Sequence, residues 1–172
     1  RFQVHLTKEV TKTSIGEFIR VNHHTYQGRV LALLIAADRQ NHLDEDIKPA
    51  LLRNDFVITD RYVESSFAFQ CLDGVDAEFL WKINQDFLRP HLSILVTASP
   101  ETISNRLASR NVFDRFEGTH TRVDEVRAFQ EASHFLQTKG YNVRTIENDG
   151  LLVSEVIDKL CDEIHRSLSS TT

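Results

Sequence analysis

An aspartate and an arginine stand side by side directly after a short apolar run. The run from Phe56 to Thr59 precedes Asp60 and Arg61, and such a run is typical of a strand that is buried on both faces of a parallel sheet. Ligands of open α/β sheets bind beyond the carboxyl ends of the strands. There, an aspartate can hold magnesium and an arginine can grip phosphate oxygens in a fork. The alternative is a surface ion pair at the end of a strand.

A second candidate is Arg39, which lies inside a helical pattern that extends from Gly28 to Asn54. Arg39 follows Ile35 by one turn, so the two side chains share a helix face. The arginine could hydrogen-bond the edge of a base while the isoleucine packs on the ring. The alternative is a solvated arginine on the helix surface, which is the commoner case.

A third candidate is the stretch Ser65–Gln70, one helix turn beyond Arg61. It combines two serines, two phenylalanines and an amide. Such a set could line a pocket for a nucleoside. An ordinary amphipathic helix is the alternative.

The fourth candidate is a group of charged residues near the middle of the second half of the chain. Arg106 and Arg110 are four residues apart and share a helix face, and a polar loop with Asp114, Arg115 and Glu117 follows them. This arrangement suits a lid, near residues 110–122, that closes arginines over phosphates. The alternative is a solvated helix end, where cations also favour the helix dipole.

These candidates depend on a framework of strands that alternate with helices. Strand patterns lie at 2–6, 56–59, 92–97 and 141–146, and helical patterns lie at 14–20, 28–54, 63–70, 76–87, 100–110, 121–140 and 152–168. Pro49 should bend or restart the second helix. Ser99 should cap the helix that opens at Pro100, and Thr121 with Asp124 resembles a capping box. The order predicts an α/β fold in one domain, residues 1–172, with a parallel sheet covered on both faces in three layers.

Composition narrows the class of protein. The chain has 172 residues, is 41% hydrophobic and has a formal net charge of −5, which argues against a non-specific nucleic-acid binder. Its two cysteines form no CxxC motif, so we expect a reduced, cytoplasmic compartment. No signal peptide, membrane span or zinc-ligand spacing is expected.

Taken in order, these segments resemble the thymidylate kinase family. The resemblance extends from about Phe2 to Gly150 and rests on Leu34–Arg39, Ile47–Leu51, Val57–Gln70, Pro100–Glu101, Arg106–Leu107, Arg110 and Asp114–Glu117. It implies a P-loop nucleoside monophosphate kinase fold with a five-stranded parallel sheet and a homodimer. An apolar helix face within Val63–Phe87 is a candidate for the dimer interface. The implied reaction is transfer of a phosphoryl group from ATP to dTMP with Mg²⁺, giving ADP and dTDP.

The resemblance also implies roles for phosphate-binding residues. Arg61 would bind the phosphate of the acceptor, and Asp60 would assist magnesium. Arg110 and Arg115 would belong to the lid and reach the phosphates of ATP.

For the nucleoside, the resemblance implies a second set of roles. Arg39 would hydrogen-bond the thymine, and Ile35 would pack on it where the family commonly has phenylalanine. Ser66, Phe69 and Gln70 would line the nucleoside pocket. Glu9 matches the glutamate of the family's Arg-Glu-Pro-Gly-Gly stretch and would belong to the substrate site.

The sequence departs from the family pattern at its beginning. The family opens with a central strand and a phosphate-binding loop of the type GxxxxGK[ST], and neither is present. A sheet without that strand would have unpaired edges in its middle, so we expect a further segment ahead of Arg1. Two alternatives stay open: a kinase for a different deoxynucleoside monophosphate, motivated by Ile35 and Lys8–Lys12, and a non-catalytic nucleotide-binding or interaction protein.

Overall fold

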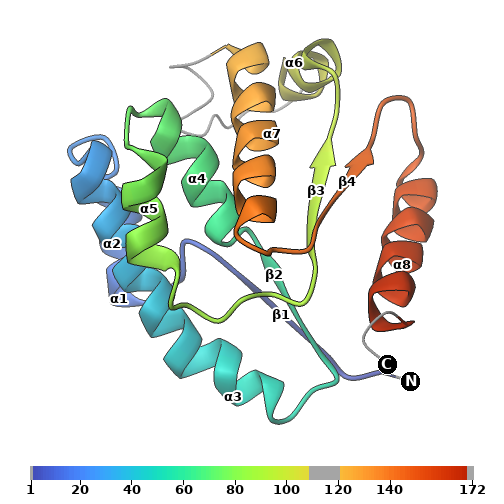
Figure 1. Cartoon of the computed structure of the whole chain (residues 1–172), viewed down its shortest axis with the longest axis horizontal. Helices are drawn as coiled ribbons and strands as arrows, with labels where there is room; N and C mark the ends of the chain where they lie inside the picture. The colour runs from blue at the N-terminus through green and yellow to red at the C-terminus, as the bar shows by residue number, and fades with distance from the viewer. Residues whose placement is uncertain (1, 109–120, 170–172) are drawn as a thin grey trace. The chain divides into compact units, whose positions relative to one another are not determined.

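Figure 1 shows the computed structural model of the protein, which describes residues 2–108 and 121–169. The chain divides into two compact units, Arg1–Leu88 and Arg89–Thr172. Both units are α/β, with parallel strands connected through helices. This confirms the expected class, while a single domain over residues 1–172 stays a prediction.

The first unit contains one two-stranded parallel ladder and a group of helices. Its elements are β1 (Val4–Lys8), α1 (Ser14–Asn22), α2 (Gly28–His42), the π-helical turn η1 (Leu43–Ile47), α3 (Lys48–Leu51), β2 (Phe56–Asp60), α4 (Val63–Leu72) and α5 (Ala77–Asn84). Lys8 is opposite Asp60 in the ladder. The residues that follow the two strands, Glu9 and Arg61, therefore lie at the same end.

The expected bend at Pro49 takes the form of a π-helical turn. The backbone N–H of Lys48 donates to the carbonyl of Leu43, five residues back. Pro49 then lies in the first turn of α3. Because proline has no N–H to donate, a change in hydrogen-bond register just ahead of it accommodates the missing bond.

The core of the first unit lies among α2, α4 and α5. Leu31, Val63, Phe67 and Leu80 are each at most 2% exposed. The large apolar side chains between Val63 and Phe87 range from fully buried, as at Phe67, to half-buried, as at Phe79, and a dimer interface on an apolar helix face there stays a prediction. The fully buried ones, Val63, Phe67 and Leu80, lie where α2, α4 and α5 pack against one another.

The second unit has the same plan. Its elements are β3 (Ser93–Thr97), α6 (Pro100–Ala108), α7 (Arg122–Thr138), β4 (Val143–Glu147) and α8 (Val153–Ser169). Both expected caps are confirmed. The hydroxyl of Ser99 accepts from the N–H of Thr102 at 3.2 Å, and Thr121 with Asp124 forms a capping box at the start of α7.

The strands are less buried than the sequence predicts. Ile58 is 48% and Val96 is 45% exposed, so the expectation of strands buried on both faces is wrong at these positions. The four described strands form two ladders, β1 with β2 and β3 with β4. In β1, side chains alternate between two faces: Thr7 contacts α2, whereas Leu6 is 72% exposed.

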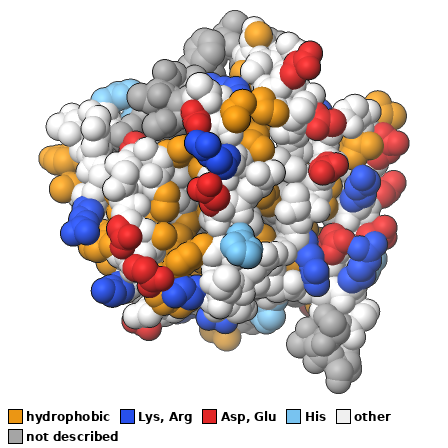
Figure 2. Space-filling view, turned by 45° about the horizontal axis from the view of Figure 1, so that its top comes forward, with side chains coloured by type: hydrophobic (Ala, Val, Ile, Leu, Met, Phe, Trp, Pro, Cys, Tyr) orange, Lys and Arg blue, Asp and Glu red, His pale blue; other side chains and the backbone are white. Residues whose placement is uncertain are grey.

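Charged side chains of both signs are interspersed on the face seen in Figure 2, without a continuous basic stripe. Within the described ranges, no helix combines the length and apolar character needed to span a membrane.

Candidate active site

The loop after β1 is fixed by hydrogen bonds from three directions. The N–H of Glu9 donates to the carbonyl of Asp60 at 3.1 Å and so continues the ladder. Asp38, only 1% exposed, accepts from the N–H of Thr11 at 2.8 Å and from its hydroxyl at 2.5 Å. Arg20 donates to the carbonyl of Val10 at 2.9 Å. These contacts give Glu9 a defined position beyond the carboxyl end of β1.

Arg39 is the centre of a buried polar cluster. Its side chain is 1% exposed, which excludes the solvated helix surface that the sequence left open. Nε and Nη2 donate to Oε2 of Glu9 at 3.0 and 2.6 Å. Nη2 also donates to Oγ of Ser66 at 2.8 Å, and Nη1 donates to Oδ1 of Asn84. The cluster therefore joins the loop after β1 with α2, α4 and α5.

Aromatic rings flank the guanidinium of Arg39. Its Cζ lies 5.2 Å from the ring centroid of Tyr62 and 5.9 Å from that of Phe87, within the range of cation–π attraction. The hydroxyl of Tyr62 donates to the carbonyl of Leu88 at 2.8 Å. Ile35, half-buried, shares the helix face of Arg39 as expected.

Arg61 has a backbone conformation that is rare for its residue type. Its φ is +71°, the only positive value among the described non-glycine residues. The hydroxyl of Thr59 donates to the carbonyl of Arg61 at 2.8 Å. The Cζ atom of Arg61 lies 5.7 Å from the ring centroid of Phe69. Backbone of this kind costs about 1–2 kcal/mol and concentrates at functional sites. This backbone conformation of Arg61 turns the chain from β2 into α4.

Asp60 ends β2 with an exposed side chain. Its carboxylate has no partner among residues 2–108 and 121–169, so both oxygens are available for a ligand. No group of three or more His, Cys, Asp and Glu side chains in the described part of the chain could hold a metal by itself.

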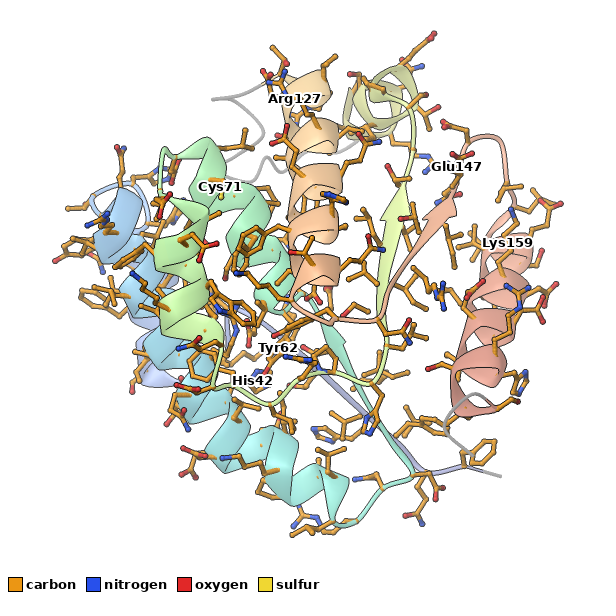
Figure 3. All side chains as sticks on the ribbon, in the orientation of Figure 1. His42, Tyr62, Cys71, Arg127, Glu147 and Lys159 are labelled. Atoms are coloured by element: carbon orange, nitrogen blue, oxygen red, sulfur yellow. The ribbon has the colours of Figure 1, made fainter. Side chains whose placement is uncertain are left out.

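A second polar network lies beside the cluster, behind Glu9. His42 of α2, labelled in Figure 3, is 3% exposed, and its Nε2 lies 2.7 Å from Oγ1 of Thr7. Thr7 donates to Asp46 at 2.7 Å, and Asp46 pairs with His5 at 2.8 Å. Burial raises the pKa of Asp46, but the hydrogen bond from Thr7 and the nearby His5 and His42 outweigh it and hold the pKa below its ordinary value.

Ser66 and Gln70 are both buried on α4, which fits a pocket lining and the inward face of an ordinary amphipathic helix alike. They are 5% and 2% exposed. Oε1 of Gln70 is buried without a hydrogen-bond partner in the described structure, which is uncommon for a buried polar atom. Phe69 is half-buried against Arg61.

The expected lid arginines, Arg110 and Arg115, lie outside the described residues. Arg106 is described and exposed, and it donates to the carbonyl of Asn148 at 2.8 Å. That hydrogen bond joins the end of α6 to the turn after β4, and both segments belong to the second unit.

Three buried polar residues were missed by the sequence analysis: Asn84 of the cluster, His42 of the second network, and Asp38, which holds the loop after β1. One signal was present for Asn84. It lies four residues after Leu80 and three before Phe87 in the expected helix, which places an amide on an apolar face.

Comparison with known proteins identifies the family. The family model described as thymidylate kinase matches residues 1–160. The chain belongs to the thymidylate kinase family. This agrees with the resemblance carried by Val57–Gln70.

Individual members of the thymidylate kinase family show how far the similarity extends. A probable thymidylate kinase of Caldivirga maquilingensis is 36% identical over 134 residues, which cover 76% of this chain and 64% of that protein. A probable thymidylate kinase of Thermococcus kodakarensis is 32% identical over 173 residues, covering 91% of this chain and 84% of that protein. The chain thus spans less than two thirds of the Caldivirga relative.

The fold of the thymidylate kinase family is also found among solved structures. A thymidylate kinase from Candida albicans superposes with a TM-score of 0.74 at 20% identity, covering 95% of this chain and 80% of that chain. The likeness shows that the fold is shared.

Proposed function

We propose that the protein transfers a phosphoryl group from ATP to dTMP, giving ADP and dTDP. The observation that carries the proposal is the buried Arg39, held by Glu9, Ser66 and Asn84 in a chain of the thymidylate kinase family. A guanidinium fixed in a low-dielectric site can donate to a base without first losing water or side-chain freedom.

The proposed acceptor site combines two arginines with different tasks. Arg39 hydrogen-bonds the thymine, and Ile35 packs on the ring from the same helix face. Ser66, Phe69 and Gln70 line the nucleoside pocket, and the unpartnered Oε1 of Gln70 supports that role. Arg61 binds the acceptor phosphate, and its exposed side chain beyond β2 suits a charged ligand. Arg110 and Arg115 are proposed to reach the phosphates of ATP.

We propose Mg²⁺ as the cofactor, held by Asp60 together with phosphates of the nucleotides. A single free carboxylate fits this ion, which typically binds through one or two carboxylates, phosphate oxygens and water. When bound, magnesium neutralises charge on the phosphate oxygens during transfer.

Other parts of the proposal concern the assembly. We infer one three-layer parallel sheet of the nucleoside monophosphate kinase type, a homodimer and a cytoplasmic location. The shared fold supports the sheet, and the family resemblance supports the dimer.

The test is release of ADP by the full-length protein, coupled to oxidation of NADH, with ATP, Mg²⁺ and a panel of dTMP, dUMP, dCMP and dGMP. The expected result is acceptor-dependent turnover with the highest kcat/KM for dTMP. Omitting Mg²⁺ should abolish turnover. Absence of turnover with every acceptor would contradict the proposal, and a clear preference for another acceptor would change the substrate.

A further inference from the structure

Asn84 is the least expected member of the cluster, and its orientation is fixed by its own helix. The side chain is 1% exposed. Nδ2 donates to the carbonyl of Leu80 at 2.8 Å, so Oδ1 is the atom that accepts from Arg39. The flipped amide would place two donors against each other and an oxygen against a carbonyl, and the contacts therefore settle the assignment.

The donors of Arg39 are nearly all taken. A guanidinium carries five N–H groups. Nε uses its one on Glu9, and Nη2 uses both on Glu9 and Ser66. Nη1 uses one on Asn84. Among the residues that the structure describes, the second N–H of Nη1 is the one with no hydrogen-bond acceptor.

This count restricts how Arg39 can bind a ligand. A fork of two parallel hydrogen bonds is excluded while Glu9 and Ser66 hold Nε and Nη2. The available donor is on Nη1, and the acceptor that fixes Nη1 is Oδ1 of Asn84. Glu9 and Ser66 anchor the opposite edge of the guanidinium.

We propose that Asn84 is a positioning residue for the base of the acceptor nucleotide. It holds Nη1 of Arg39 so that the remaining N–H donates to a carbonyl oxygen of the base. A pyrimidine that presents a carbonyl at this point is accepted, and one that presents an amino group meets a second donor and is rejected. The inference rests on the proposed function and adds the residue that sets its base preference.

The test compares three variants of the full chain. Asn84→Ala removes the acceptor for Arg39. Asn84→Asp keeps an oxygen at that position but loses the donor to Leu80. Gln85→Ala is the matched control, since Gln85 is the exposed neighbour at the end of α5. Titration calorimetry measures the Kd for dTMP and dCMP, thermal melting measures stability, and NMR follows the guanidinium signals of Arg39.

The expected result is that Asn84→Ala weakens dTMP binding about tenfold and lowers the preference for dTMP over dCMP by a similar factor, because a hydrogen bond to a charged group is lost. Its Arg39 signals should broaden. Asn84→Asp should keep the Kd for dTMP within about threefold, although the lost bond to Leu80 lowers its melting temperature. Gln85→Ala should match the unsubstituted protein.

Three outcomes would overturn the inference. Unchanged dTMP binding in Asn84→Ala would show that Asn84 does not position Arg39. Equal weakening in Asn84→Ala and Asn84→Asp, in step with their melting temperatures, would assign Asn84 to the fold alone. If the unsubstituted protein binds dCMP as tightly as dTMP, or neither, the proposed function fails first and the inference falls with it.

Discussion

At the scale of single residues, the ion pair between Arg39 and Glu9 is hard to explain by stability. Their side chains are 1% and 5% exposed, and desolvation costs several kcal/mol for each charge. Well-packed apolar residues often stabilise a core as much or more. A guanidinium held in one orientation is, however, what recognition of a polar base edge requires. The proposed recognition of a base therefore explains this buried pair better than stability does.

Two substitutions of Arg61 distinguish the role of its side chain from the effect of its backbone conformation. Arg61→Ala and Arg61→Gly both remove the guanidinium, and each should lower kcat/KM for dTMP by about a hundredfold or more if Arg61 binds the acceptor phosphate. Because φ is +71°, glycine fits the backbone better than alanine. Urea unfolding should therefore show Arg61→Gly to be more stable than Arg61→Ala by about 1 kcal/mol. Equal kcat/KM in the variants and the unsubstituted protein would remove Arg61 from the site.

The lowered pKa of Asp46 predicts an acid-dependent loss of stability. With a folded pKa below the ordinary 3.8, the unfolded chain takes up the proton first as the pH falls. The contribution of Asp46 to the free energy of unfolding should be complete above about pH 5 and should decrease as the pH drops through 3.8 and below. Asp46→Asn should flatten this decrease by less than about 1 kcal/mol, since Asp46 is partly exposed and screened by water.

The control for Asp46 is Glu45→Gln in the same π-helical turn. Glu45 is exposed, and its carboxylate has no partner in the described ranges. Urea unfolding at pH 6, 4 and 3 should give Glu45→Gln the profile of the unsubstituted protein. Identical profiles for Asp46→Asn and the unsubstituted protein would contradict a stabilising effect of the network from Thr7 to Asp46 on this carboxylate.

At the scale of elements, the contact of α1 with the loop after β1 helps to fix where Glu9 lies. Gly16 is buried in the first turn of α1, and a Cβ at this position would come within 2.0 Å of the carbonyl oxygen of Thr11. The obstacle is backbone, so it cannot rotate away. The loop and the helix must separate to admit any side chain.

Gly16→Ala should therefore destabilise the protein by about 1–3 kcal/mol, the usual range for overpacking. Moving the loop should also displace Glu9 and weaken dTMP binding. The matched control is Ser14→Ala, an exposed position two residues earlier in α1, which should stay within about 0.5 kcal/mol. Chemical unfolding and calorimetric titration check both effects. A stable Gly16→Ala variant with normal dTMP affinity would disprove the close packing.

Local patterns in the sequence were enough to predict most elements. Alternating strands and helices, the cap at Ser99 and the capping box at Thr121 depend on neighbours within a few residues, and all are confirmed. Arg39 and Arg61 were also found, because their positions on a helix face and after a strand are local features. Phosphate and base roles for them remain proposals.

Contacts between distant segments could not be predicted in this way. Asn84 meets Arg39 across 45 residues, and no periodicity links the two. The same holds for Asp38 and Thr11, which are 27 residues apart. The exposure of Ile58 depends on which elements cover the strand, and an apolar run does not carry that information. The sequence therefore located candidate side chains but not the partners that hold them.

At the scale of the whole molecule, the proposed base site belongs to one of the two units. Arg39, Ser66 and Asn84 all lie within Arg1–Leu88. The second unit has a recess of about 350 Å³ between β4 and α8, lined by Glu147 and Lys159, which Figure 3 labels, and by Asp162, Glu163 and Arg166. Its carboxylates outnumber its cations, so it is poorly suited to a dianionic phosphate.

Hydrogen exchange with mass spectrometry can assign dTMP to one of these places. Saturating dTMP should slow amide exchange in α2, α4 and α5, because a ligand on Arg39, Ser66 and Asn84 opposes their local opening. Exchange in α8 should not change. The control ligand is thymidine, which lacks the phosphate and should protect the same helices only at higher concentration. Protection confined to β4 and α8 would place the nucleotide in the second unit and would contradict the site built around Arg39.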